Sequence, residues 1–274
     1  NSEADTKYSR ERFTTGSISY FIGGDTVKVG VIGLGSVGTA VYNVMSEHHP
    51  MVGFDIDGRG SFDEISSTNI VFICVPTNGL PNGNLDCGSV RSVCERLSEA
   101  DYTGLVVIKS TLHPFSMDSL AQVTPDLDLV YMPEFLRERD AEAWFRSPDR
   151  LVVGGNRELA KKALDYFRWV PKDIPRLIMN PLEAEIAKLA HNAYIATKVT
   201  FTCEIERICQ ANEVDSFKVM EVIWNDRRIR NPAHLTPGLG GFDGKCVPKD
   251  TRSLRTIDVA TDEQSLLAFV LAPS

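Results

Sequence analysis

Short apolar runs alternate with helical patterns through the first two thirds of the chain. The first run, Val27 to Ile32, is rich in β-branched residues, which is typical of a strand buried on both faces of a parallel sheet. Further runs lie at 51–56, 69–75, 105–109, 129–132, 151–153 and, more weakly, 175–179. Helical spacing occupies 39–47, the stretch from Asp86 or Ser89 to Ala100, a segment after Pro114, and 157–169. The alternation predicts an α/β fold with a Rossmann-type, doubly wound parallel sheet.

One connection in this alternation is unusually short. Only the polar stretch Gly58 to Thr68 separates the second run from the third. A parallel crossover needs about a dozen residues or more. We therefore expect a single helical turn around Asp63 to Ile65, and a nucleotide-binding fold that is trimmed on that side.

The pattern changes after residue 180. Residues 182–212 contain neither glycine nor proline, and apolar residues recur at helical spacing, which predicts a helix about 45 Å long at 1.5 Å per residue. Such helices often support a domain junction or a dimer interface. A second helix is expected over 216–224. We expect three parts: a polar arm over 1–25, which adds an edge strand or packs on a partner subunit, a sheet domain over 26–179 and a helical domain over 180–274.

Composition narrows the classes of protein. The 274 residues carry a net charge of −8, which disfavours a nucleic-acid partner. No apolar run is long enough to span a membrane, and residues 1–16 lack the apolar core of a signal peptide. The six cysteines form no CxxC pair, which favours reduced thiols and a cytoplasmic setting. His191 has no second ligand at metal spacing, so no metal site is expected.

The first apolar run continues into Gly33-Leu34-Gly35-Ser36-Val37-Gly38 and then into a helical pattern. Strand, GxGxxG and helix in this order favour dinucleotide binding, because bare backbone and a helix N-terminus receive the pyrophosphate. Asp55 follows about 20 residues later, where an acid binds the ribose 2′-hydroxyl of NAD and repels the 2′-phosphate of NADP. The alternative is a structural turn with an unrelated aspartate.

Polar or special residues also follow several other predicted strands. They are Val75-Pro76-Thr77, Ser110-Thr111 and the segment Pro133 to Glu138. Ligands of open α/β sheets bind beyond the carboxyl ends of the strands. Each segment alone could be turn chemistry, but together they indicate one crevice.

Four glycines precede Cys246 within residues 238–246, so the cysteine is presented on a loop. Lys245 and Lys249 flank it, and positive charge favours the thiolate. If a helix begins near Pro248, Asp250 lies in its first turn, where it could cap the helix or face the sulfur. The alternative is a tight loop with an incidental cysteine.

Two further groups of residues are candidates for binding. Lys188 and Asn192 are four apart and share one face of the long helix. The basic cluster Asp226-Arg227-Arg228-Ile229-Arg230 could bind a phosphate bidentately. A solvated helix face and a solvated charge run are the respective alternatives.

Taken together, these segments resemble the UDP-glucose/GDP-mannose dehydrogenase family from about Val27 to the end of the chain. The matching pieces are GLGSVG at 33–38, VPT at 75–77, KST at 109–111, PEFLRE at 133–138, the helix with Lys188 and Asn192, RRI at 227–229 and KCVPKD at 245–250. The resemblance implies oxidation of the C6 alcohol of a nucleotide sugar to a carboxylate with two NAD per turnover. UDP-glucose is the expected substrate, and GDP-mannose or a UDP-N-acetylhexosamine is the alternative. A non-catalytic remnant that only binds NAD or the sugar nucleotide is a further alternative.

The resemblance also implies roles for single residues. Cys246 matches the nucleophile, which forms a thiohemiacetal and then a thioester. Lys188 and Asn192 match the donors that stabilise the oxyanion. Thr111, Glu138 and Asp250 match residues that activate water or accept protons. The implied cofactor site comprises Gly33, Gly35, Ser36, Val37, Gly38, Asp55, Val75, Pro76, Thr77, Ser110, Thr111, Glu138 and Lys249.

The implied substrate site comprises Phe135, Leu136, Arg137, Lys188, Asn192, Arg228, Gly240, Gly241 and Phe242. Arg228 matches an arginine that reaches the substrate of a neighbouring subunit. The resemblance therefore implies a homodimer formed across the helix 182–212.

The sequence departs from the family pattern in two further respects. Asp243 replaces the third glycine of the usual G-x-G-G-x-C loop, and its charge opposes both a thiolate and a pyrophosphate, which Lys245 can offset. Family members continue into another nucleotide-binding domain, whereas this sequence ends at Ser274. The sequence is therefore expected to be either truncated or a reduced form, and Asp243 together with the short crossover favours a streamlined, divergent family member over a simple truncation.

Overall fold

The structure is a computed structural model that describes residues 21–22, 25–238, 240–242, 244–262 and 264–272. Residues 1–20 of the expected arm, and Asp243, lie outside the described residues. Strands β1 (Phe21–Ile22) and β2 (Asp25–Thr26) form a separate antiparallel pair. The expected edge strand of the arm is therefore paired with its own continuation.

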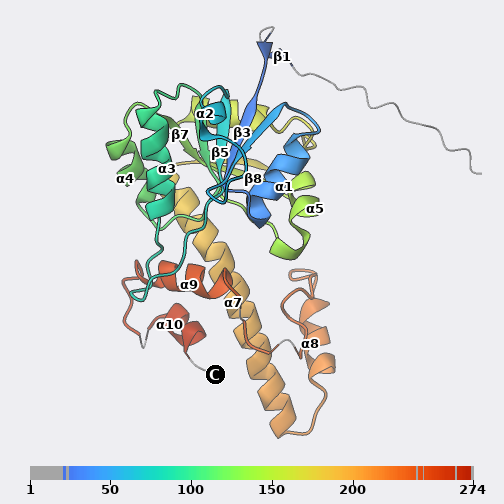
Figure 1. The fold of residues 1–274 in the computed structure, drawn as a ribbon. Coiled ribbons are helices and arrows are strands. Elements are labelled where there is room, and N and C mark those ends of the chain that lie inside the picture. The colour runs from blue at the N-terminus through green and yellow to red at the C-terminus, as the bar shows by residue number, and fades with distance from the viewer. Residues whose placement is uncertain (1–20, 23–24, 239, 243, 263, 273–274) are drawn as a thin grey trace, which may run out of the picture.

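A seven-stranded sheet forms the centre of the part of the chain up to residue 179 (Figure 1). Its strands, in spatial order, are β4 (Met51–Phe54), β3 (Val29–Ile32), β5 (Ile70–Ile73), β6 (Leu105–Ile108), β7 (Asp128–Tyr131), β8 (Leu151–Gly155) and β9 (Arg176–Met179). The chain leaves β3 for β4 on one side and later returns to β5 on the other. The strand order therefore reverses at β3, and such a switch point opens a crevice at the carboxyl end of that strand.

The fold class is confirmed, but the sheet is mixed rather than wholly parallel. The five strands from β4 to β7 are parallel, whereas β8 runs antiparallel to β7 and β9 is parallel to β8. The connection from β7 to β8 carries a 3₁₀ turn, Glu138–Asp140, and the helix α5 (Ala141–Arg146). Because this connection does not carry the chain back to the amino end of β7, β8 starts at the carboxyl end of β7 and runs antiparallel to it. The apolar runs could not show this direction.

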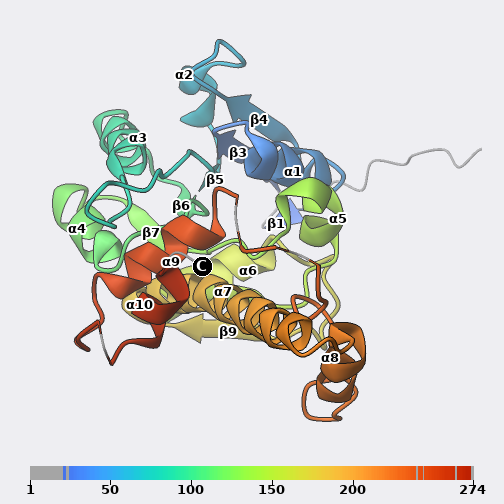
Figure 2. The ribbon, with the colours of Figure 1, turned by 90° about the horizontal axis from the view of Figure 1, so that it is seen from below.

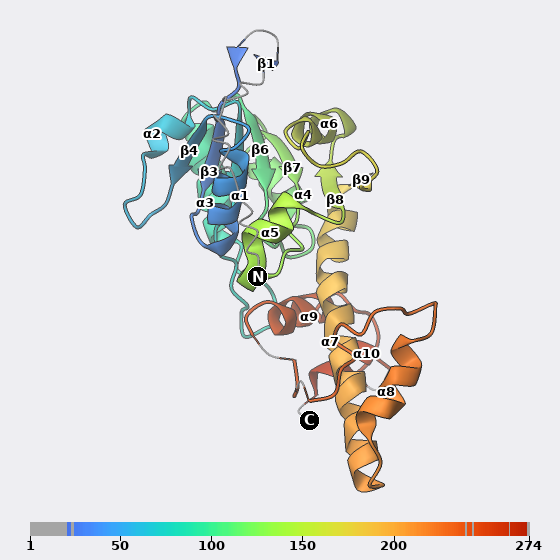
Figure 3. The same cartoon turned by 90° about the vertical axis from the view of Figure 1, so that its right-hand side faces the viewer.

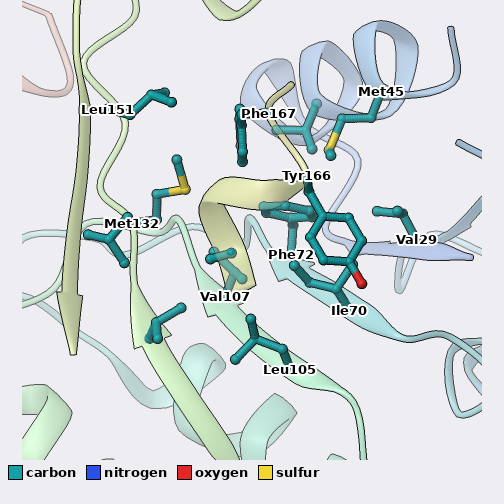
Figure 4. Packing of buried hydrophobic residues seen from close by; sticks show 14 of the residues in the cluster. Val29, Met45, Ile70, Phe72, Leu105, Val107, Met132, Leu151, Tyr166 and Phe167 are labelled. Carbon is teal, nitrogen blue, oxygen red and sulfur yellow. The ribbon is translucent and has the colours of Figure 1, made fainter. Parts of the chain in front are cut away.

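Helices cover both faces of the sheet. Successive strand residues point to opposite faces, so Ile70 and Phe72 pack in one cluster and Val71 and Ile73 in the other. The first cluster also contains residues of α1 (Ser36–Met45), α5 and α6 (Arg157–Asp165). Figure 4 shows it around Phe72, Phe167 and Met45. The second contains residues of α3 (Gly88–Glu99), α4 (Ser116–Val123) and α2.

The short crossover is confirmed as a single helical turn. Helix α2 spans Phe62–Ile65, and both of these side chains are buried against the sheet. One turn is enough because two apolar residues cover the small area beside β3 and β4. Asp86 was expected to cap α3; its carboxylate accepts a hydrogen bond from the Gly88 N–H at 2.9 Å, although Cys87 occupies the N-cap position.

The long helix is α7 (Pro181–Ala211), with 31 residues. Asn180 and Glu183 form a capping box, and Pro181 occupies the first turn, where its missing N–H is not needed. A Cβ added to Gly154 of β8 would lie 2.7 Å from the Ala184 Cβ, so the first turns press against the sheet. The helix then continues well beyond the strands (Figures 1 and 3).

Three shorter helices surround the free part of α7. Helix α8 (Ser216–Trp224) has the predicted bounds and is capped by the Asp215 carboxylate. Helices α9 (Val247–Arg255) and α10 (Leu266–Leu271) pack on α7 and on each other. Viewed along α7, α9 and α10 lie on one side and α8 on the other (Figure 2).

Candidate functional site

Helix α9 is docked against loops at the carboxyl end of the sheet. The His113 Nδ1 lies 2.9 Å from the Ser253 Oγ, which joins the loop after β6 to α9. A Cβ on Gly79 would lie 3.2 Å from the Lys249 Cβ, and one on Gly83 would lie 2.8 Å from the Thr256 side chain. The loop after β5 therefore approaches α9 so closely that it needs glycine. This docking brings the residues before α9 to the crevice at the strand ends.

Asp250 forms the centre of a buried polar cluster between α9 and α7. Its side chain is fully buried. The Asn192 Nδ2 donates to its Oδ2 at 2.6 Å, and the Lys249 Nζ pairs with its Oδ1 at 2.6 Å. The structure thus brings together three predicted residues. Asp250 lies in the first turn of α9 as expected, but its oxygens bind side chains, and no side chain caps this helix.

Lys188 is buried one turn before Asn192 on α7. Burial lowers the pKa of its ammonium group, and the negative charges of Asp250, Cys246 and Glu134 partly restore it. The ammonium nitrogen also lies 5.4 Å from the centroid of the Phe135 ring. Lys188 therefore stands between the three acidic groups as the cation of a desolvated site.

Cys246 is exposed and immediately precedes α9. Its sulfur is therefore not turned into the apolar interior. The flanking lysines differ: Lys245 is exposed, whereas the Lys249 amine is held by Asp250. Cys246 also lies close enough to Lys188 to influence the pKa of the lysine.

Glu134 was not among the predicted residues, yet it joins this cluster. The Lys109 Nζ pairs with the Glu134 Oε2 at 2.9 Å and donates to the Met132 carbonyl at 3.2 Å. The other oxygen of Glu134 accepts the N–H groups of Phe135 and Leu136 at 2.9 and 3.1 Å. The signal in the sequence was Lys109 itself, because a lysine at the end of a buried strand needs a buried acid.

The glycine motif fits a dinucleotide. Gly33 has φ of +89°, and a Cβ there would lie 2.7 Å from the Cys74 carbonyl oxygen. A Cβ on Gly38 would lie 1.7 Å from the Gly33 carbonyl oxygen, so α1 packs on this strand only through glycine. A Cβ on Gly35 would meet nothing within 4 Å, which leaves open space above its backbone for a pyrophosphate. The three glycines thus have the three roles that this motif requires.

Two acids border the glycine motif. The Leu34 N–H donates to the Asp55 Oδ2 at 2.6 Å, which holds this carboxylate at the end of β4 where a ribose would lie. The Ser36 Oγ donates to the Glu138 Oε1 at 3.2 Å. Glu138 therefore lies at the cofactor loop, while Glu134 lies in the cluster around Lys188. The adjacent Val37 is half-buried in α1.

The remaining predicted residues follow the strand ends. The Ser110 Oγ donates to the Val75 carbonyl at 2.7 Å, which ties the ends of β5 and β6 together. Pro76 is exposed, Thr77 is buried and Thr111 is half-buried. Phe135 and Leu136 are half-buried after β7, and Arg137 is exposed.

The loop before Cys246 lies along the far half of α7. The Cys203 Sγ donates to the Gly240 carbonyl at 2.8 Å, and the Gly238 N–H donates to the Glu206 carboxylate at 2.8 Å. Gly241 is exposed and Phe242 half-buried. Arg228 is exposed after α8 and forms a bidentate pair with Asp226, so its described contacts lie outside the cluster around Lys188.

None of the helices in the described part of the chain has the length and apolar character that a membrane span needs. No group of three or more His, Cys, Asp or Glu residues within the described ranges is arranged to hold a metal ion.

Comparison with known proteins identifies the family. The model of the UDP-glucose/GDP-mannose dehydrogenase family, NAD binding domain, matches residues 59–167, and that of the same family's central domain matches residues 182–269. The UDP-glucose 6-dehydrogenase of Haloferax volcanii is 30% identical, with 83% of this chain and 64% of the relative covered. The GDP-mannose 6-dehydrogenase of Pseudomonas aeruginosa is 31% identical, with 69% of this chain and 47% of the relative covered.

A solved structure agrees. The UDP-glucose dehydrogenase of Pyrobaculum islandicum has a TM-score of 0.76 at 28% identity, covering 88% of this chain and 65% of that one. The chain thus spans about half to two thirds of the length of these relatives. The matched domain takes NAD as its cofactor, and the glycine motif has the space that NAD needs. The chain belongs to the UDP-glucose/GDP-mannose dehydrogenase family.

Proposed function

We propose that this protein oxidises the C6 alcohol of a nucleotide sugar to a carboxylate, with Cys246 as the covalent nucleophile. The observation that carries this proposal is the exposed Cys246 beside the buried cluster of Lys188, Asn192 and Asp250, at the sheet edge that also holds the glycine motif. Each of these residues has a role in such a reaction, and the packing of α9 on α7 brings them close together.

NAD, when bound, accepts the hydride that leaves the sugar carbon. The other tasks belong to the protein. The Cys246 thiolate adds to the C6 aldehyde and forms a thiohemiacetal, whose oxygen carries negative charge during the addition. Lys188 and Asn192 donate hydrogen bonds to this oxygen, and Asp250 holds the Asn192 amide in place by accepting a hydrogen bond from its Nδ2 at 2.6 Å. The thiohemiacetal carbon then loses a hydride to a second NAD, which gives the thioester, and water hydrolyses the thioester and releases the acid and the thiol.

Water activation has two candidate groups. Glu134 is an anion paired with Lys109 at 2.9 Å and close enough to Lys188 to influence its pKa. Thr111 is half-buried at the end of β6, two residues after Lys109. We assign water positioning to this pair, and cofactor contact to Glu138, because Glu138 is hydrogen-bonded to Ser36 of the glycine motif. The role implied for Glu138 by the resemblance is thus divided between two glutamates.

The proposed substrate is UDP-glucose, because the relative named UDP-glucose 6-dehydrogenase is 30% identical over 83% of this chain, whereas a GDP-mannose 6-dehydrogenase that matches over the same share is 28% identical. GDP-mannose is the second candidate, supported by the similarity to enzymes named GDP-mannose dehydrogenase. The half-buried Phe135, Leu136 and Phe242, with Arg137, Gly240 and Gly241, would form the wall of the sugar-nucleotide site.

We also propose that residues 26–179 and 180–274 form two domains and that the protein is a homodimer through α7. The boundary is supported by the end of β9 at Met179 and the start of α7 at Pro181. Tyr194, Phe201 and Ile208 are seven residues apart, so they share one stripe of α7, and their exposed fractions are 64, 46 and 49%. A stripe of this kind fits a second copy, which would bring Arg228 toward the site of its neighbour.

NADH absorbance with a panel of nucleotide sugars tests the function. We expect reduction of NAD with UDP-glucose, two NADH per acid formed, and no acid from Cys246→Ser, while that variant still binds NAD. If NAD is reduced with GDP-mannose but with no other sugar nucleotide, GDP-mannose would replace UDP-glucose as the proposed substrate. If no sugar nucleotide is oxidised, or if Cys246→Ser forms acid at the wild-type rate, the proposal fails.

A further inference from the structure

A buried acid, Glu185, lies one turn before Lys188 on α7 and is not part of the predicted site. Its side chain is fully buried. Its Oε2 accepts the Phe115 N–H at 2.7 Å, and its Oε1 accepts the Met117 N–H at 2.8 Å. These N–H groups belong to the start of α4, which follows the loop that carries Thr111. One carboxylate thus joins that loop to the helix that carries Lys188.

Other contacts hold the loop from Ser110 to Met117 along its length, including a bond from the Leu112 N–H to the Tyr131 hydroxyl at 3.4 Å and one from the Ser116 Oγ to the Cys87 Sγ at 3.6 Å. Ser110 is bonded to the Val75 carbonyl, and His113 to Ser253 of α9. Phe115 adopts a left-handed conformation, with φ of 71°, which a bulky residue seldom takes without support. The bond from the Phe115 N–H to Glu185 provides that support. Without Glu185, the end of the loop would have two free donors and a strained turn.

We propose that Glu185 is a positioning residue that sets the place of Thr111 relative to Lys188. The expected effect on turnover rests on the proposed function, whereas the hydrogen bonds of Glu185 to the loop do not depend on it. A carboxylate accepts both N–H groups. A protonated carboxyl group carries its proton on one oxygen, which then becomes a poor acceptor, so one of the two bonds is lost.

The charge on Glu185 is sensitive to its surroundings. The pKa of Glu185 is raised to about 7: burial is the largest cause and the carboxylate of Asp118 adds to it, whereas the N–H groups of Met117, Phe115 and Ser116 lower the pKa. The Tyr131 hydroxyl also lies near Glu185, and the pKa of that phenol is raised by burial first and then by nearby negative charges, including that of Glu185. Above pH 7 the Glu185 carboxylate on α7 therefore accepts both N–H groups at the start of α4, and below pH 7 one of these two hydrogen bonds is lost.

The kinetic test uses Glu185→Gln, which has the shape of glutamate but only one acceptor oxygen. We expect kcat to fall about tenfold to a hundredfold, since small misplacements of reacting groups cost that much, with little change in the KM for NAD. In the wild type, kcat should rise with pH through about 7, and this rise, the acid limb of the pH profile, should disappear in Glu185→Gln. A purely structural role would lower the melting temperature and leave the limb in place.

Asp118→Asn provides a matched second variant, because Asp118 is exposed and only its charge acts on Glu185. We expect it to move the limb to lower pH and to leave the maximal rate unchanged. Hydrogen exchange of the Phe115 and Met117 amides, measured in the wild type without substrate, should be slower at pH 8 than at pH 6 after correction for intrinsic rates. This readout stands even if no sugar nucleotide is oxidised. Equal protection at both pH values, or a Glu185→Gln variant with wild-type kcat and limb, would overturn the proposal.

Discussion

Replacing Asp250 by asparagine should destabilise the fold in a way that depends on pH. The substitution keeps the shape of the side chain but removes the charge that pairs with Lys249 and supports Lys188. Breaking a buried ion pair costs about 3–5 kcal/mol of the free energy of unfolding. The Lys249 side chain is 18% exposed and can turn toward water, so we expect the lower end, about 3 kcal/mol at pH 7.

The pH dependence comes from Lys188. Burial lowers its pKa in the folded state, so between that value and the ordinary pKa of 10.5 the unfolded chain carries one more proton. The free energy of unfolding therefore increases with pH in this window, by up to about 1.4 kcal/mol per pH unit. Asp250→Asn removes a charge that raises this pKa, which extends the window downwards. The difference in the free energy of unfolding between Asp250→Asn and the wild type should consequently become smaller as the pH rises from 7 toward 10.

Urea unfolding, followed by the fluorescence of Trp144, Trp169 and Trp224, measures this difference at each pH. Glu95→Gln is a matched control, because its pair with Arg91 has a similar length, 2.8 Å, but both side chains are about half exposed. Exposed pairs contribute at most about 1 kcal/mol. The reasoning is refuted if Asp250→Asn costs no more than this control, or if its cost is the same at pH 7 and pH 10.

Two other predictions follow from contacts already described. Gly35→Ala should abolish NAD binding, because its Cβ would enter the space for the pyrophosphate, and should leave the melting temperature unchanged, because that Cβ would meet no protein atom. Gly38→Ala should lower the free energy of unfolding by about 3 kcal/mol, because its Cβ would overlap the Gly33 carbonyl. Titration calorimetry measures the first effect and thermal unfolding the second, and equal behaviour of the two variants would contradict the assigned roles. Phe201→Asp should convert the proposed dimer into a monomer in sedimentation, with Lys161→Asp on the exposed face of α6 as the control for added charge; a dimer that persists in Phe201→Asp would exclude the α7 stripe as the interface.

Local patterns determined much of the fold. Continuous apolar runs located the strands of the main sheet, because a strand buried on both faces is apolar along most of its length. The absence of glycine and proline predicted α7, and the length of the connection before β5 predicted the single turn of α2. The glycine motif was readable because each of its positions has a local steric requirement.

The cluster around Lys188 could be predicted only in part. Lys188, Asn192 and Asp250 were recognised through their motifs, but the bond between Asn192 and Asp250 joins residues 58 positions apart. Of the two glutamates in the PEFLRE segment, the one paired with Lys109 could not be chosen from their spacing. Which of them enters the cluster depends on the direction in which the chain leaves β7.

The sequence by itself determined the order of strands and helices along the chain, the cofactor loop and the identity of the candidate nucleophile. These features depend on backbone freedom and on faces formed by residues that are near neighbours in the sequence. Only the tertiary structure decided the reversed direction of β8, the docking of α9 that brings Cys246 toward Lys188, and the partners of Glu134 and Glu185. The physical reason is that a buried charge is stabilised by whichever opposite charge or N–H group the packing brings within about 3 Å. That partner comes from a distant part of the chain, and no local pattern specifies it.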